Sequence, residues 1–124
     1  FGGIFDGADV FVDFDGVIAK YDGYRGDEHY GEPIEGAKEF LEKLKSFGLK
    51  PVIFSARKSE NVIIWFKKYG FPTNLEVTNI KVPAPVYIDD RCLKFNGDFS
   101  KLLRDLKNFN CYWRKDKIFK SYIK

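Results

Sequence analysis

The stretch that decides the fold is VFVDFDG, residues 10–16. Its first half is an apolar run of β-branched and aromatic residues, which is typical of a strand buried on both faces. Its second half changes to two aspartates, Asp13 and Asp15, followed by Gly16. We therefore predict a buried strand over Ala8–Phe14 that ends at a pair of carboxylates.

Further apolar runs predict more strands along the chain. The strong ones are Leu49–Phe54 and Val86–Ile88, and a weaker one lies at Leu75–Thr78. A last strand is expected at Asn110–Trp113.

Between these strands, apolar residues recur at helical spacing and predict three helices. The first begins at Pro33, because the missing N–H of proline costs nothing in a first turn, and it stops at Gly48. Ser59 is expected to cap the second helix and Asp98 the third. The polar, glycine-rich segment Ala19–Glu32 is expected to form a loop or small flap.

Strands that alternate with helices predict an α/β fold, a three-layer Rossmann-like parallel sheet with helices on both faces. We expect a single domain over residues 1–124, with a basic tail at about 115–124. Ligands of such sheets bind beyond the carboxyl ends of the strands. The polar residues expected to meet at that edge are Asp13, Asp15, Ser55, Asp89 and Asp90.

Four carboxylates at one edge of a sheet predict a bound cation. As bare anions, Asp13, Asp15, Asp89 and Asp90 would repel one another by on the order of several kcal/mol. Mg²⁺ takes oxygen ligands and commonly binds one or two carboxylates together with a substrate phosphate. A role as turn or cap residues would explain one Asp-Gly pair, but it explains two aspartate pairs at two strand ends less well.

Four short motifs resemble those of the haloacid dehalogenase superfamily. They are VDFDGV at residues 12–17, VIFS at residues 52–55, Lys81, and VYIDD at residues 86–90. Their order and spacing match the superfamily across residues 9–92, and the first and last motifs together carry the resemblance. The segments after the first motif and after the second strand are too short for the cap domain of larger members. The chain is therefore similar to small, capless, phosphatase-like members.

The resemblance implies a phosphatase that works through an aspartyl-phosphate. Asp13 would attack phosphorus as the nucleophile, and Asp15 would act first as general acid and then as general base. Ser55 would donate a hydrogen bond to a phosphoryl oxygen, and Lys81 would neutralise phosphoryl charge. The simpler alternatives are a serine that only caps its turn and a lysine that only lies on the surface.

The resemblance also implies Mg²⁺ as the cofactor. Its ligands would be the Asp13 carboxylate, the Asp15 backbone carbonyl, and a carboxylate of Asp89 or Asp90. We favour Asp90 as the direct ligand. Arg57 and Arg91 each follow a motif closely, so each either binds a substrate phosphate or pairs with the acidic cluster.

The substrate is open between a phosphorylated small molecule and a nucleic-acid end. Capless members act on macromolecules, and Ile88–Arg91 with Cys111–Trp113 is similar to the 3′-phosphatase half of phage-type polynucleotide kinases. Residues 101–124 hold eight lysines and arginines against two aspartates, a net charge of +6 that suits a polyanion or a solvated tail. A phosphatase domain of a larger protein and a catalytically idle binding module are the other hypotheses. The idle module is disfavoured because Asp13 and Asp15 are both present.

Composition excludes several other classes of protein. The chain is 44% hydrophobic and 31% charged, which argues against disorder. Its two cysteines are too few for a disulfide framework and match no zinc motif, so reduced thiols and a cytoplasmic location are expected. No apolar run approaches the roughly 18 residues that span a bilayer, so no membrane partner is expected. The chain contains no methionine, so we expect either a processed or excised piece of a longer protein or a chain whose start is missing.

Overall fold

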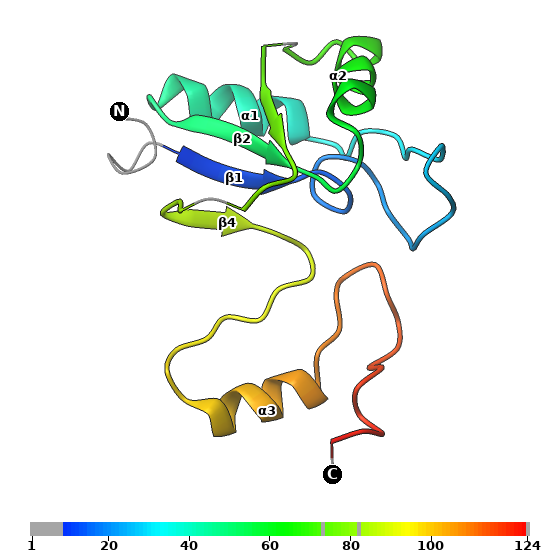
Figure 1. Ribbon diagram of the computed structural model, residues 1–124, viewed down its shortest axis with the longest axis vertical. Helices are drawn as coiled ribbons and strands as arrows, with labels where there is room; N and C mark the ends of the chain where they lie inside the picture. The colour runs from blue at the N-terminus through cyan, green and yellow to red at the C-terminus, as the bar shows by residue number, and fades with distance from the viewer. Residues whose placement is uncertain (1–8, 73, 82, 124) are drawn as a thin grey trace. The chain divides into compact units, whose positions relative to one another are not determined.

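The computed structural model describes residues 9–72, 74–81 and 83–123 (Figure 1). The chain divides into two compact units, Phe1–Asp89 and Asp90–Lys124. Among the described residues, the first unit contains the sheet and two helices, and the second contains one helix. The single domain expected over residues 1–124 stays a prediction.

The first unit is built on a parallel sheet of four strands in the order β3-β2-β1-β4 (Figure 1). The strands are β1 (Asp9–Asp13), β2 (Lys50–Phe54), β3 (Glu76–Thr78) and β4 (Val86–Ile88). All four were predicted from apolar runs, although the predicted start of the first, Ala8, lies outside the described residues and Phe14 lies beyond its end. In the central strand, Phe11 pairs with Val52 on one side and Tyr87 on the other.

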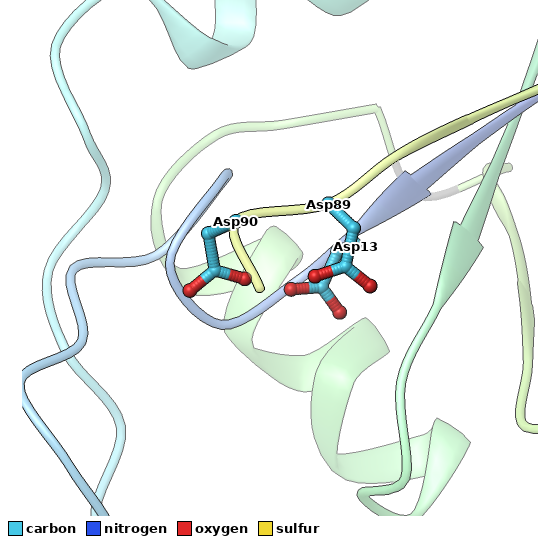
Figure 2. A group of neighbouring side chains, drawn as sticks. All are labelled: Asp13, Asp89 and Asp90. Carbon is cyan, nitrogen blue, oxygen red and sulfur yellow. The ribbon is translucent and has the colours of Figure 1, made fainter. Parts of the chain in front are cut away.

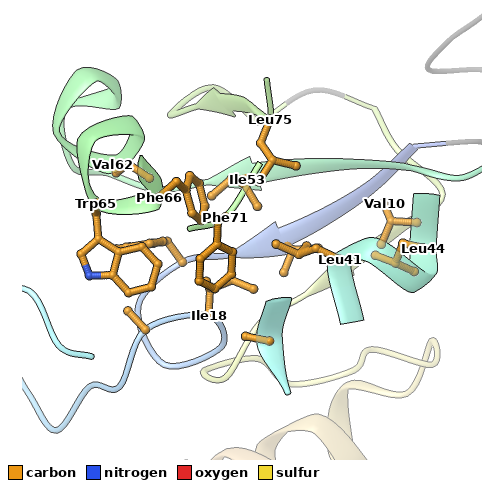
Figure 3. Close-up of a cluster of buried hydrophobic side chains, with 14 residues drawn as sticks. Val10, Ile18, Leu41, Leu44, Ile53, Val62, Trp65, Phe66, Phe71 and Leu75 are labelled. Atoms are coloured by element: carbon orange, nitrogen blue, oxygen red, sulfur yellow. The ribbon is translucent and has the colours of Figure 1, made fainter. Parts of the chain in front are cut away.

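Helices α1 (Ala37–Ser46) and α2 (Ser59–Lys68) enclose one hydrophobic core with the sheet (Figure 3). Side chains alternate between the two faces of a strand, so Val10 and Val12 point from β1 into this core while Phe11 points to the opposite face. Val12 is fully buried, as are Leu41 of α1 and Phe66 of α2. Burying a side chain of this kind contributes about 1.5–3 kcal/mol. This core holds the end of β1, and with it Asp13, in place.

The first helix begins later than predicted. Pro33 does not open it, because it forms an antiparallel bridge with Ala19, and the next amide, that of Ile34, donates to the Ile18 carbonyl at 2.8 Å. The chain then turns through Gly36, whose φ of 90° is unfavourable for other residues, and α1 starts at Ala37. The proline is therefore used in an extended segment that closes the loop following β1.

Two further details of the helix ends test the sequence predictions. The N-cap of α2 is Lys58, so the predicted cap Ser59 is wrong and is instead the first helical residue. The predicted stop of α1 at Gly48 is confirmed, since the helix ends at Ser46 just before it. No helix lies between β3 and β4 among described residues 79–81 and 83–85, in agreement with the short segment seen in the sequence.

The second unit contains α3 (Phe99–Lys107). Its predicted cap is confirmed, because the Asp98 side chain accepts a hydrogen bond from the Lys101 amide at 3.1 Å. The strand predicted at Asn110–Trp113 is wrong. The chain turns there, with the Arg114 amide donating to the Cys111 carbonyl at 3.1 Å, and these residues join no sheet. An apolar run without a neighbouring strand has no ladder to join.

The Rossmann-like parallel α/β architecture without a large cap domain, expected from the sequence, is confirmed. Within the described part of the chain, no helix combines the length and apolarity needed to cross a membrane.

Candidate functional site

The polar residues predicted at the strand ends of the first unit do meet at one edge of the sheet. Asp13 is the last residue of β1 and pairs in register with Phe54, the last residue of β2. Ser55 follows directly and anchors the next strand, since its amide donates to the Thr78 carbonyl at 3.0 Å. Asp89 follows β4 in the same way, because Val12 and Ile88 are register partners.

A tight turn after β1 fixes the positions of Asp13 and Asp15. The Phe14 carbonyl accepts hydrogen bonds from the amides of Ile18 and Ala19 at 2.9 and 3.0 Å. Gly16 adopts a φ of 88°, which only glycine takes without strain, and its amide donates to the Ala19 carbonyl at 2.8 Å. This chain reversal explains why a glycine follows Asp15 in the sequence.

Three carboxylates form a group that can hold a metal ion. Asp13, Asp89 and Asp90 each offer an oxygen, and these oxygens lie within 4.8 Å of one another (Figure 2). Asp90 is the first residue of the second unit and follows Asp89 through a peptide bond. An all-oxygen donor set suits Mg²⁺, Ca²⁺ or Mn²⁺ and does not by itself select among them.

The environment of Asp90 supports a cation at this position. Its Oδ2 accepts a hydrogen bond from the Trp113 indole N–H. Its Oδ1 is buried and accepts no hydrogen bond from the described residues. A buried carboxylate oxygen without a partner is costly, and a metal ion would remove that cost. The residues present therefore fit the predicted cofactor.

Two arginines flank the same tryptophan. The guanidinium of Arg91 lies 5.8 Å from the centre of the Trp113 ring, and that of Arg114 lies 5.3 Å from it. The sequence left Arg91 open between substrate binding and pairing with the acidic cluster. In the structure, the Arg91 guanidinium lies over the ring of Trp113, whose indole N–H binds Asp90, and all three residues belong to the second unit.

Asp15 is not part of the carboxylate group, because its side chain binds Arg57. The Arg57 Nε lies 2.7 Å from Asp15 Oδ2, and Nη2 lies 3.2 Å from Oδ1, a two-point ion pair. The side chains are only 14% and 17% exposed, so solvent screens this pair less than an ordinary surface ion pair. Arg57 therefore pairs with one of the predicted acidic residues, and its binding of a substrate phosphate stays a prediction.

Arg57 is held on its other sides as well. Its guanidinium stacks on the Tyr30 ring at 4.1 Å from the centroid, and Nη1 donates to the Asp27 carbonyl at 3.2 Å. Burial alone would lower the pKa of Arg57, but the hydrogen bonds and negative charge of Asp15, with a contribution from Tyr30, raise that pKa above its ordinary value. The arginine is thus a fixed cation beside the candidate acid.

Ser55 and Lys81 occupy different environments. Ser55 is buried and its hydroxyl oxygen accepts from the Arg57 amide at 3.1 Å, which leaves its O–H as a donor. Lys81 is exposed, and its ammonium lies 5.0 Å from the centre of the Tyr87 ring. Tyr87 contacts Phe11, which shares a face of the sheet with Asp13. Phosphoryl binding by either side chain stays a prediction.

Sequence reasoning missed the roles of Trp113 and Tyr30. Trp113 was predicted to lie in a strand, whereas its indole N–H orients a carboxylate. The only signal was general, since a tryptophan N–H or a tyrosine O–H needs a partner when it is shielded from water.

Comparison with known proteins supports the fold and does not indicate an activity. A solved structure of a conserved protein from Bacteroides thetaiotaomicron is similar to this chain, with 25% sequence identity and a TM-score of 0.54. The similarity covers 80% of this chain and 88% of that one. No family model matches the chain, and no curated protein matches it.

Proposed function

We propose that the chain is a Mg²⁺-dependent phosphomonoester hydrolase of the haloacid dehalogenase type. The observation that carries the proposal is the group formed by Asp13, Asp89 and Asp90, whose carboxylate oxygens lie within 4.8 Å of one another. The strand-end position of Asp13 and Asp89 is where ligands of parallel α/β sheets bind.

In the first step, a carboxylate oxygen of Asp13 attacks the phosphorus of the substrate. The new bond is Asp13 O–P, and the bond that breaks joins phosphorus to the leaving oxygen. Asp15 transfers a proton to that oxygen, so the first product departs as a neutral alcohol. The Ser55 O–H donates to a phosphoryl oxygen during this transfer.

In the second step, water attacks the phosphorus of the aspartyl-phosphate. Asp15 takes a proton from the water, the Asp13 O–P bond breaks, and inorganic phosphate leaves. Each atom and proton is accounted for, and nothing is oxidised or reduced. When bound, Mg²⁺ would neutralise negative charge on the phosphoryl oxygens. Asp13 and Asp90 would hold it, with Asp89 available as a further ligand.

The ion pair with Arg57 places a condition on the role of Asp15. Both oxygens of Asp15 accept hydrogen bonds from Arg57, at 2.7 and 3.2 Å. Proton transfer to a leaving group requires one oxygen to turn away from the arginine while the other stays bound. A two-point pair allows this rotation with the loss of one hydrogen bond rather than two.

The same ion pair favours one competing function, a cation-binding module without catalysis. In that case the Asp15–Arg57 pair would be structural and Asp15 would never exchange a proton with a ligand. The two functions share the metal site and differ in whether Asp13 becomes phosphorylated.

The test is hydrolysis of a generic aryl phosphate by the full chain with Mg²⁺, with EDTA, and with the variant Asp13→Asn. The proposal expects phosphate release that requires Mg²⁺ and is lost in the variant. Binding of beryllium fluoride with Mg²⁺, followed by ¹⁹F NMR, reports on Asp13 independently of the leaving group. Absence of both phosphate release and beryllium fluoride binding would contradict the proposal and leave the binding module.

A further inference from the structure

A pocket of about 400 Å³ lies within the first unit, between the loop that follows β1 and the connection from β2 to α2. Pockets for small ligands usually measure roughly 300–1,000 Å³. The proposed chemistry uses only one of the lining residues, Arg57. The lining residues are Tyr24, Asp27, Glu28 and Tyr30 from the loop, and Ala56, Arg57, Lys58 and Asn61 from the opposite side.

The loop side of the pocket is fixed by hydrogen bonds at both its base and its tip. At the base, the Lys20 amide donates to the Glu32 carbonyl at 2.8 Å. The Trp65 indole of α2 donates to the Gly31 carbonyl at 2.9 Å, and the Arg57 guanidinium donates to the Asp27 carbonyl at 3.2 Å. The pocket is therefore formed before a ligand arrives, which reduces the entropy lost on binding.

The pocket adjoins the candidate general acid through Arg57. One edge of the guanidinium binds the Asp15 carboxylate, and the same residue lines the pocket. In the proposed reaction Asp15 protonates the leaving oxygen, so the leaving group departs on the side of Asp15. The pocket is the concave surface next to that position.

The charges of the pocket describe the kind of group it would accept. Arg57 is neutralised by Asp15, so the charges left to a ligand are those of Asp27, Glu28 and Lys58. The two carboxylates outnumber the one remaining positive charge. The carboxylates of Asp27 and Glu28 accept hydrogen bonds, as do the phenol oxygens of the two tyrosines, whereas Lys58 and Asn61 donate them. The Tyr24 O–H already donates to Asp27 at 3.0 Å, which leaves its oxygen as an acceptor. Such a lining favours hydroxyl or ammonium groups and disfavours a further phosphate.

We infer that this pocket binds the leaving group of a small phosphomonoester, one that carries hydroxyl or amino groups and no additional negative charge. The inference rests on the proposed function and selects between its two substrate classes. It favours a small phosphorylated metabolite over the phosphorylated end of a polynucleotide, whose neighbouring phosphates would meet Asp27 and Glu28.

The experiment compares kcat/KM for two substrates of similar size whose leaving groups carry opposite charges, O-phosphoethanolamine and 2-phosphoglycolate, and for a 3′-phosphorylated oligonucleotide. The inference expects at least a tenfold preference for phosphoethanolamine over each of the others. The variant Glu28→Lys should shift the ratio toward phosphoglycolate, whereas Glu35→Lys, which introduces the same charge change outside the pocket, should not.

A second variant tests the pocket by volume. Asn61→Trp fills part of it and should raise KM for glucose 6-phosphate more than for phosphoethanolamine, whose leaving group is smaller. A preference for the oligonucleotide or for phosphoglycolate would overturn the inference while the proposed function stands. No hydrolysis of any of these phosphates would overturn the inference, and if beryllium fluoride binding were also absent it would overturn the proposed function as well.

Discussion

Asp15 and Asp90 both follow a strand of the sheet and are both half-buried, yet their side chains have different hydrogen-bond partners. Asp15 receives two hydrogen bonds from a cationic side chain, Arg57. Asp90 receives one from the neutral indole of Trp113, and its other oxygen is buried without a hydrogen bond from the described residues. One carboxylate is neutralised by the chain itself, whereas the other has a buried oxygen that the proposed cation would satisfy. The four aspartates thus divide into three clustered carboxylates, which form the proposed metal group, and Asp15, the proposed acid, which pairs with Arg57.

The largest expected effect comes from removing the carboxylate that lacks an internal cation. Asp90→Asn should weaken Mg²⁺ binding by more than the roughly 10–100-fold typical of losing an outer partner of a metal ligand. Without metal, the same variant should not destabilise the fold, because it removes one of three clustered negative charges. Isothermal calorimetry with Mg²⁺ and urea unfolding of the metal-free protein measure the two effects. Unchanged affinity would show that Asp90 is not a ligand.

Arg57→Gln removes the cation that neutralises Asp15. It should lower the stability of the fold rather than the affinity for Mg²⁺. The free energy of unfolding should fall by about 1.5–3 kcal/mol, because hydrogen bonds to a charged group are lost and Asp15 is left shielded from water. Mg²⁺ affinity should change little. Lys58→Gln removes the neighbouring positive charge, which is exposed, and serves as the control. Equal stability of the two variants would mean that the Asp15–Arg57 pair contributes nothing.

Trp113→Phe keeps the aromatic ring and removes only the N–H that orients Asp90. We expect Mg²⁺ affinity to fall by roughly 10–100-fold, because a ligand without its supporting hydrogen bond is less well placed. Trp65→Phe is the matched control, since it also removes an indole hydrogen bond, the one to the Gly31 carbonyl, and should leave Mg²⁺ affinity unchanged. Calorimetry on both variants decides between orientation of Asp90 and a general loss of packing.

The smallest effect concerns the loop beside Arg57. The Tyr24 phenol donates to Asp27, and this hydrogen bond, together with the carboxylate charge, raises the pKa of Tyr24 above its ordinary value. The contribution to stability is therefore present below the unfolded pKa of about 10 and is lost as the pH rises through the raised value. Tyr24→Phe should be slightly less stable than the parent at pH 8, with a smaller difference at high pH. A difference that grows with pH would contradict this.

The sequence was most informative where local pattern decides structure. The apolar run before Asp13 predicts β1, and the alternation of strands and helices places Ser55 and Asp89 at the same edge as Asp13. Prediction from the sequence failed where segments that are distant along the chain contact each other. Pro33 looks like a helix start until Ala19, distant in sequence, pairs with it.

The partners of the two aspartates were anticipated unequally: the sequence left Arg57 open as a partner of the acidic cluster, but it did not indicate that Trp113 binds Asp90. Arg57 lies 42 residues from Asp15, and Trp113 lies 23 residues from Asp90. No local rule links residues at such separations, so the sequence identified the carboxylates but not which of them the chain would neutralise. The pocket beside Arg57 depends on the same long-range contacts and was likewise not predicted.

The most direct test of the account is whether Asp13 becomes phosphorylated. The full chain would be incubated with Mg²⁺ and acetyl phosphate, quenched in acid, digested and examined by mass spectrometry. The account predicts one added phosphoryl group on the peptide that contains Asp13, and none with EDTA or in Asp13→Asn. Label on another residue, or an unmodified Asp13 peptide in a chain that binds Mg²⁺, would contradict the nucleophile and leave a cation-binding protein.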